Sequence, residues 1–243
     1  HEDLASRFPY VDVFIRPQQY RPLLEMVGER LGVDWEGCVG SLANLRPSVS
    51  CYIPVIKGCD LMCAFCIIPY RRGRQVSRPV EEVLDEVKLL TARGVKEVTL
   101  LGQTVDAYGY DLADRPNLAL LLRRLDNLDG LRRIRFLTSH PIFMSEEIVQ
   151  VVAQLEKVCE HINLPVQAGD DVVLERMRRR YTRDDYRRLV YAIRETVPDV
   201  ALSTDIIVGF PGESRKQFTR TLELVEELQF DKVHGASYSD RPG

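Results

Sequence analysis

The sequence has little that would mark a membrane, secreted or disulfide-stabilised protein. No apolar run approaches the ~18–20 residues of a membrane span, and no signal-peptide pattern opens the chain. Six cysteines in 243 residues are too few for a disulfide scaffold. A net charge of −3 excludes a globally basic nucleic-acid-binding protein, although not a local basic patch. The chain begins at His1 and not at methionine, so we expect a piece of a longer protein.

The composition is that of a globular protein, with 45% hydrophobic and 28% charged residues. From about residue 52 onward, strand-like runs lie at 52–56, 98–101, 134–137, 161–166, 202–208 and 233–238. Amphipathic helical patterns alternate with them at about 80–90, 118–125, 146–155, 186–197 and 215–228. This alternation predicts a parallel α/β sheet, either doubly wound and open or an incomplete (β/α) barrel. In both, the loops at the carboxyl ends of the strands carry the chemistry.

The N-terminal residues 1–48 do not continue this regular alternation of strands and helices. Residues 11–15 look like a strand and residues 20–31 like a helix, and a loop-like stretch follows from 32 to 47. We therefore interpret residues 1–48 as the tail of a separate small α/β domain plus a linker. Residues 49–243 form the main domain in this interpretation.

Three cysteines are crowded into eight residues directly after the first predicted strand. Cys59, Cys63 and Cys66 form a C-x3-C-x2-C motif, and thiolates are the soft ligands of iron–sulfur clusters and zinc. Three ligands leave a cubane-type cluster with one iron open to a substrate or cofactor. The alternatives are a structural zinc site and three unrelated buried thiols. A closed zinc site normally takes four ligands in paired knuckles, and neither Cys38 nor Cys51 has a partner at that spacing.

The motif, with an aromatic residue before its last cysteine, resembles the signature of the radical S-adenosylmethionine (SAM) enzymes. The resemblance implies a partial or full (β/α) barrel, here a partial (β/α)6 barrel. It implies a 4Fe–4S cluster held by Cys59, Cys63 and Cys66, with SAM bound at the open iron. One-electron reduction then cleaves SAM to a 5′-deoxyadenosyl radical. Phe65 is expected near the SAM adenine.

Further segments resemble the methylthiotransferase family within this superfamily. They are CIIPYRRGR at 66–74, SRP at 77–79, LGQTV at 101–105, RFLTSHP at 135–141, LPVQAG at 164–169, TDIIVGFPGE at 204–213 and YSDRPG at 238–243. The run at 138–141 and the closing segment at 238–243 are closest to the MiaB-type tRNA branch. That branch adds a methylthio group to C2 of N6-isopentenyladenosine next to the anticodon. Other branches act on threonylcarbamoyl adenosine of tRNA or on a ribosomal-protein aspartate, and an iron–sulfur RNA-binding module without catalysis is the non-enzyme alternative.

The same resemblance suggests which residues contact SAM, although it assigns no catalytic residue. Gly102 and Gln103 end the second strand, where the superfamily binds the SAM amino group. Gln167 and Arg179 are expected at the ribose and carboxylate, because a guanidinium binds a carboxylate through two parallel hydrogen bonds. The remaining expected contacts lie in a strand–glycine–helix segment whose backbone can approach adenine closely, at Asp205, Gly209 and Phe210.

Charge and family together suggest the partners. Residues 67–78 carry four arginines and no acid, and residues 171–195 carry eight arginines against five acids, which suits an RNA backbone. Solvated helix faces are the alternative. Tyr70 or Tyr181 could stack on an unpaired base. We expect a cytoplasmic monomer that uses a tRNA anticodon stem-loop, a low-potential electron donor and a sulfur donor, and no membrane.

The chain departs from the family in several places. Thr104 and Asp106 stand where the tRNA branch usually has asparagines, and Ala168 and Asp170 replace serines. The family also uses a second 4Fe–4S cluster, whose ligands are absent from this chain, and an RNA-binding TRAM domain. We therefore expect the truncated chain to be only partly active.

Overall fold

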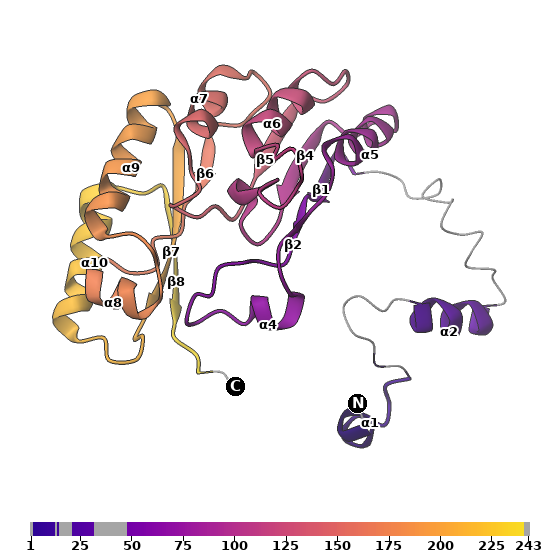
Figure 1. Cartoon of the computed structure of the whole chain (residues 1–243), viewed down its shortest axis with the longest axis horizontal. Helices are drawn as coiled ribbons and strands as arrows, with labels where there is room; N and C mark the ends of the chain where they lie inside the picture. Colours follow the sequence, from indigo (N-terminus) through magenta and orange to yellow (C-terminus); the bar gives the residue numbers. More distant parts are fainter. Residues whose placement is uncertain (1, 13, 15–20, 32–47, 241–243) are drawn as a thin grey trace. The chain divides into compact units, whose positions relative to one another are not determined.

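A computed structural model describes residues 2–12, 14, 21–31 and 48–240 (Figure 1). The chain divides into two compact units, residues 1–46 and 47–243. Within the described ranges, no helix is both long and apolar enough to cross a membrane. The segments at 32–47 and 241–243, which carry Cys38 and the end of the last family motif, lie outside the described residues.

The first unit contains two helices, α1 (Glu2–Arg7) and α2 (Arg21–Leu31). The second of them is the helix predicted at 20–31. The strand predicted at 11–15 is wrong for its described residues, because residues 11, 12 and 14 belong to no strand. An extended segment needs a partner strand to satisfy its backbone groups, and the described part of this unit offers none. Asp12 instead pairs with Arg30 at 2.5 Å.

The second unit is built on six parallel strands, all at the predicted places. They are β1 (Ser50–Pro54), β4 (Glu97–Leu101), β5 (Arg133–Phe136), β6 (His161–Asn163), β7 (Ala201–Val208) and β8 (Lys232–Ser237). They pair in the order β1-β4-β5 and β6-β7-β8, and an isolated parallel bridge joins Ile134 of β5 to Val158, which shortly precedes β6. No pairing between β1 and β8 occurs among the described residues, so the barrel stays open. The predicted partial α/β barrel is therefore confirmed.

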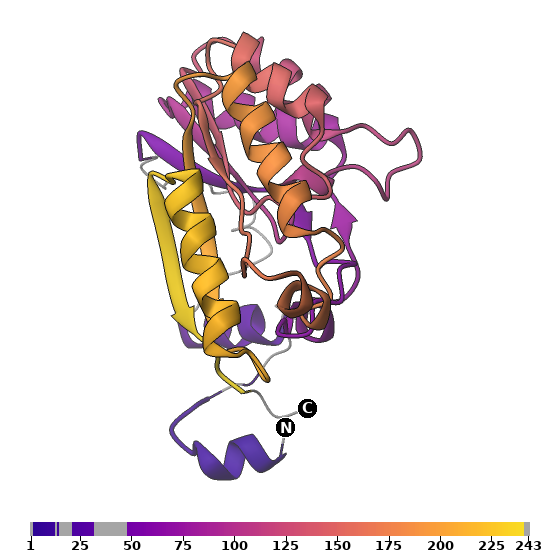
Figure 2. The ribbon, with the colours of Figure 1, turned by 90° about the vertical axis from the view of Figure 1, so that its left-hand side faces the viewer.

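Five amphipathic helices follow the outer side of the curved sheet (Figures 1 and 2). They are α5 (Val80–Ala92), α6 (Leu118–Asp126), α7 (Glu146–Gln154), α9 (Arg183–Thr196) and α10 (Arg215–Leu228). Their apolar stripes pack on strand side chains such as Val98, Ile134 and Ile162, which are fully buried. Side-chain caps fix the starts of four of them, and Ser145 and Ser214 each accept a bond from a first-turn N–H.

Short elements that the periodicity did not indicate lie near the carboxyl ends of the strands. They are the antiparallel pair β2 (Ile56–Lys57) and β3 (Val76–Ser77), with α4 (Ile68–Arg72), the 3₁₀ turn η2 (Val105–Ala107) and α8 (Asp171–Arg176). The β2–β3 pair closes the base of the loop that carries the three clustered cysteines. Because all six long strands run parallel, their carboxyl ends and these short elements meet at one edge.

Candidate functional site

A cavity of about 210 Å³ lies at this edge. Its walls come from the cysteine loop and from the segments after β4, β5 and β6, together with a side chain of β7. Segments more than one hundred residues apart in sequence thus line one space. A parallel α/β sheet gathers its chemistry in this way, because every strand delivers its following loop to the same edge.

The three clustered cysteines all line this cavity. Their loop turns sharply at Gly58, whose φ is +72°; a Cβ there would lie 2.1 Å from the Arg74 carbonyl oxygen. The Leu61 N–H donates to Cys59 Sγ at 3.4 Å, and Thr104 Oγ1 lies 3.4 Å from the same sulfur. Hydrogen bonds of this kind stabilise a thiolate.

The donor set fits an iron–sulfur cluster. Within the described ranges, no three His, Cys, Asp or Glu side chains are already gathered around a metal position. Three thiols on one short loop that line one cavity, two of them accepting hydrogen bonds, are nevertheless what a thiolate-ligated cluster requires. Cys51 and Cys159 do not line the cavity.

Five of the residues expected to contact SAM also line the cavity. They are Phe65, Gln103, Gln167, Arg179 and Asp205. Burial raises the pKa of Asp205 above its usual range. Their assignment to parts of SAM stays a prediction, but the fold does bring them beside the cysteines.

The other three expected SAM contacts lie outside the cavity lining. The Cα of Gly102 faces Ile56, whose Cβ would be 3.1 Å from an added side chain. The Gly209 N–H already donates to Glu213 at 2.7 Å. Phe210 packs edge-to-face on Tyr238 with ring centroids 5.4 Å apart. Packing and local hydrogen bonds therefore occupy these residues, and their contact with SAM stays a prediction.

Arg179 is buried and not a solvated helix-end arginine. It is 8% exposed and donates to Tyr181 Oη at 2.9 Å, to the Pro165 carbonyl at 3.1 Å and to Cys63 Sγ at 3.5 Å. A buried cation next to a thiol favours the thiolate. The same contacts bury Tyr181, so the prediction that this ring could stack on an RNA base is wrong.

The segment after β5 contributes cavity residues to which the sequence motifs assigned no role. Thr138, Ser139 and His140 follow β5 and line the cavity, with Asp106 of η2 behind them. The His140 N–H donates to Asp106 Oδ2 at 2.7 Å. Their position directly after the third predicted strand was the available signal, because that is where a parallel sheet places functional loops.

Burial keeps this wall neutral at physiological pH. Desolvation raises the pKa of Asp106 to about 8, although the His140 N–H and the charge of Arg179 oppose the shift. Desolvation also lowers the pKa of His140 to about 3, helped by the positive charges of Arg179 and Arg180. Both side chains are therefore uncharged near pH 7.

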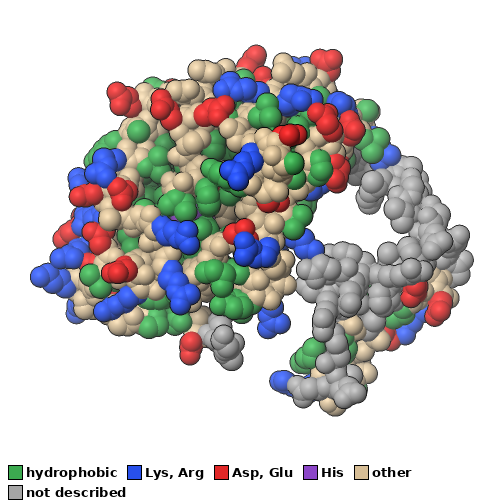
Figure 3. All heavy atoms as spheres, viewed as in Figure 1, with side chains coloured by type: hydrophobic (Ala, Val, Ile, Leu, Met, Phe, Trp, Pro, Cys, Tyr) green, Lys and Arg blue, Asp and Glu red, His purple; other side chains and the backbone are tan. Residues whose placement is uncertain are grey.

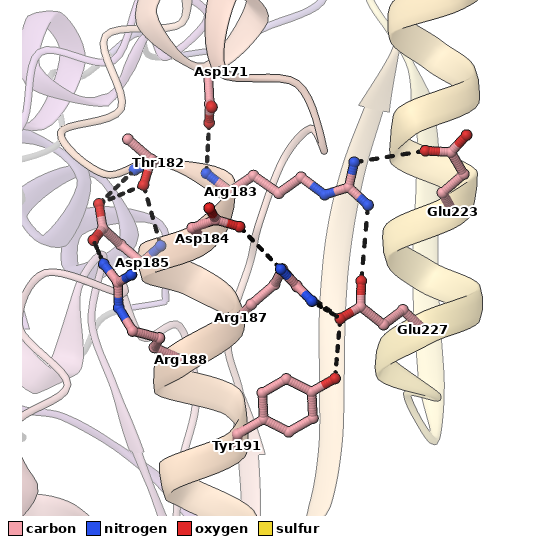
Figure 4. A network of polar contacts seen from close by, with 10 residues as sticks. All are labelled: Asp171, Thr182, Arg183, Asp184, Asp185, Arg187, Arg188, Tyr191, Glu223 and Glu227. Atoms are coloured by element: carbon pink, nitrogen blue, oxygen red, sulfur yellow. Dashed lines mark hydrogen bonds and ion pairs between the residues drawn. The ribbon is translucent and has the colours of Figure 1, made fainter.

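Of the two arginine-rich runs, the second is largely paired. Arg187 donates to Glu227 at 2.6 Å, Arg183 lies 3.6 Å from Glu223, and Arg188 pairs with Asp185 (Figure 4). This network joins α9 to α10. On the face shown in Figure 3, cationic and anionic side chains are interspersed. The alternative of solvated helix faces describes this run better than a free basic patch.

In the first arginine-rich run, two arginines remain free. Arg74 pairs with Asp60 at 2.7 Å, and Arg78 pairs with Glu82 and Glu86. Arg71 and Arg72 of α4 are exposed and have no ion-pair partner among the described residues. The adjacent Tyr70 is 68% exposed. The free basic surface therefore lies on α4, next to the cysteine loop.

Comparison with known proteins identifies the fold. The chain resembles the TsrM radical SAM methyltransferase of Kitasatospora setae, solved with tryptophan and a SAM analogue bound. The TM-score is 0.64 at 21% identity, over 80% of this chain and 37% of that one. It also resembles methylornithine synthase PylB, with a TM-score of 0.56 at 19% identity, over 80% of this chain and 54% of that one.

Curated sequences give higher identity. This chain is 50% identical to a protein of Herpetosiphon aurantiacus and 48% identical to one of Roseiflexus sp., over 98% of its length in each case. Both relatives are named tRNA-2-methylthio-N(6)-dimethylallyladenosine synthase. The chain spans about half the length of these relatives, 54% and 50% respectively. The family model described as "Radical SAM superfamily" matches residues 53–225, and the chain therefore belongs to the radical SAM superfamily.

Proposed function

We propose that this chain is the SAM-cleaving part of a methylthiotransferase that modifies tRNA. The proposed product carries a methylthio group at C2 of N6-isopentenyladenosine, which is the dimethylallyladenosine of the relatives' names. The observation that carries the proposal is the single cavity that gathers Cys59, Cys63 and Cys66 with Gln103 and Arg179. The identity of 44–50% with synthases of that name supports the substrate.

In this proposal Cys59, Cys63 and Cys66 hold a 4Fe–4S cluster. When bound, the cluster supplies the electron for reductive cleavage of SAM at its open iron. Arg179 donates a hydrogen bond to the Cys63 sulfur and places a positive charge at the cavity. Gln103 and Gln167 offer amide donors and acceptors that orient SAM, and the buried walls exclude water from the reacting atoms.

The remaining partners follow from the same chemistry. The reaction needs a low-potential electron donor, a sulfur donor and a tRNA anticodon stem-loop. For the second 4Fe–4S cluster expected in the family, this sequence supplies no visible ligand set. Reduced thiols and a reduced cluster suit the cytoplasm. The free arginines of α4 give the RNA backbone a contact next to the cavity.

Two measurements test the proposal. The chain is reconstituted anaerobically with iron and sulfide and is then given SAM, dithionite and an anticodon stem-loop that carries isopentenyladenosine. We expect 5′-deoxyadenosine by mass spectrometry in the wild type and in Cys159→Ala, but not in Cys63→Ala. In a strain from which the gene is deleted, we expect tRNA to lose its methylthio-isopentenyladenosine. Unchanged methylthio-isopentenyladenosine in that strain would contradict the proposed substrate.

A further inference from the structure

The cavity wall formed by the segment after β5 is rigidly built. The Val105 N–H donates to the Thr138 carbonyl at 2.9 Å, and the His140 N–H donates to Asp106 Oδ2 at 2.7 Å. Thr138 has a φ of +68°, which costs energy for a β-branched residue. A strained residue held by two hydrogen bonds across loops points to a loop whose shape is needed for a task beyond folding.

Two polar atoms of this wall have no partner. Asp106 Oδ1 and Ser139 Oγ are both buried, in side chains of residues only 2% and 4% exposed, and neither is hydrogen-bonded within the described part of the chain. A buried polar atom without a partner destabilises a fold. Native proteins rarely leave such atoms unpaired unless a ligand or water completes them. Ser139 lines the cavity, so its unpartnered hydroxyl lies at the wall, although the oxygen itself has almost no exposed surface.

His140 adds a donor beside Ser139. Its Nδ1 accepts a bond from the Ile142 N–H at 3.3 Å. In a neutral imidazole the other nitrogen, Nε2, then carries the hydrogen. The ring also lines the cavity and is held edge-on to Tyr181, with centroids 5.7 Å apart. The wall thus offers an N–H donor and a hydroxyl that can donate or accept.

The charge of the wall selects the class of ligand. Asp106 and His140 are both uncharged near pH 7, and the cation of the cavity, Arg179, hydrogen-bonds Cys63 although its charge also acts on these two side chains. A carboxylate or phosphate is therefore better placed against Arg179 than against Ser139 and His140. The wall suits a flat, neutral group with ring-nitrogen acceptors and an amino donor, and the edge of a purine is such a group.

We infer that Ser139 and His140 form the subsite for the purine edge of the target adenosine, and that Asp106 is the positioning residue behind them. This inference rests on the proposed function and names the part of the cavity that receives the RNA base. The SAM adenine is the other purine in the reaction. Phe65 is expected to accompany it, which leaves the wall after β5 to the RNA.

Binding of synthetic stem-loops by the reconstituted chain tests the inference. One stem-loop carries isopentenyladenosine and a second carries an abasic site at the same position, so contacts to phosphates are common to both. For Ser139→Ala we expect a Kd about five- to tenfold higher for the first stem-loop, from the loss of one hydrogen bond, and no change for the abasic one. SAM affinity should stay at the wild-type value and Tm should not fall, because the hydroxyl has no partner in the protein and its removal relieves an unpaired buried atom.

Three further variants complete the test. Thr196→Ala removes an exposed hydroxyl on α9 that bonds the Ala192 carbonyl, and it should change no Kd. Asp106→Asn retains an acceptor for the His140 N–H and should bind the first stem-loop like the wild type, whereas Asp106→Ala should weaken it.

Three results would overturn the inference, and they are distinguishable. If Ser139→Ala binds the isopentenyladenosine stem-loop like the wild type, the subsite is wrong. If it loses affinity for SAM and not for this stem-loop, the wall serves the SAM adenine. If the wild type binds SAM but neither stem-loop, the proposed RNA substrate fails and the inference fails with it.

Discussion

At the scale of single residues, the cysteines differ by where the fold places them. Cys59, Cys63 and Cys66 face the cavity, whereas Cys159 precedes β6 outside it, where burial raises the pKa of its thiol. A thiolate ligand cannot be replaced by alanine without loss of the cluster, but a half-buried thiol can be.

Visible absorbance checks this difference directly. After anaerobic reconstitution, we expect the broad ~400 nm band of a 4Fe–4S protein in the wild type and in Cys159→Ala, and at most a tenth of it in Cys63→Ala. Equal bands in all three proteins would show that Cys63 is not a ligand.

Asp106 makes the stability of the fold depend on pH. Its pKa rises from the ordinary 3.8 to about 8 in the folded chain, so the folded state holds one more proton than the unfolded state between these values. Its stabilising contribution is thus fully present below pH 3.8 and is lost as the pH rises to about 8.

Asp106→Asn should remove this dependence. Between pH 5 and 8, the free energy of unfolding of the wild type should fall relative to Asp106→Asn, by at most about 1.4 kcal/mol per pH unit. Urea denaturation at several pH values measures the difference. Parallel profiles for the two proteins would mean that Asp106 is ionised in the folded state.

The sequence indicated one side of the cavity and not the other. Cys59 and its neighbours stand in a spacing that few other chemistries use, and Gln103 ends a predicted strand. The roles of Ser139 and Asp106 were inferred because Ser139 Oγ and Asp106 Oδ1 are buried without a hydrogen-bond partner among the described residues. No sequence pattern reveals such an unpaired atom. Arg179 looked like many arginines at helix ends, and only the fold shows that it is buried.

At the scale of elements, periodicity predicted the long pieces and missed the short ones. The helix at 215–228 is predicted to the residue, because its cap and its apolar stripe agree. The five- and six-residue helices α4 and α8 contain less than two turns, too few to repeat a 3.6-residue pattern. The strand expected at 11–15 had an apolar run, but the described residues of its unit offer no strand to pair with.

The cap of α10 gives a prediction at this scale. Ser214 Oγ accepts the Gln217 N–H, and Gln217 bonds back to the Ser214 N–H at 2.9 Å, forming a capping box. Ser214→Ala should lower the free energy of unfolding by about 1 kcal/mol, and Ser214→Asp, which keeps a cap, should lower it less. Urea denaturation compares the three proteins, and an alanine variant as stable as the wild type would contradict the role of the cap.

At the scale of the whole molecule, charge is distributed unevenly although the net charge is −3. Free arginines lie on α4 at the cavity edge, and Arg132 precedes β5 at the opposite edge of the sheet. Arg72→Glu should therefore weaken stem-loop binding several-fold and lower the salt slope of log Kd by about 0.7 or more, because a phosphate contact is lost. Arg132→Glu makes the same charge change and should leave both unaffected. Equal losses in the two variants would indicate only long-range repulsion.

The open six-stranded barrel places every predicted functional loop at one edge, and the proposed chemistry depends on that arrangement. In the proposed function, the cavity at this edge holds a 4Fe–4S cluster and cleaves SAM. The most direct measurement is the iron and sulfide content of the anaerobically reconstituted chain, followed by 5′-deoxyadenosine formation with SAM and dithionite. We predict about four iron and four sulfide per chain and 5′-deoxyadenosine that requires dithionite. A chain that takes up zinc or no metal, or that binds the iron yet forms no 5′-deoxyadenosine, would contradict the account.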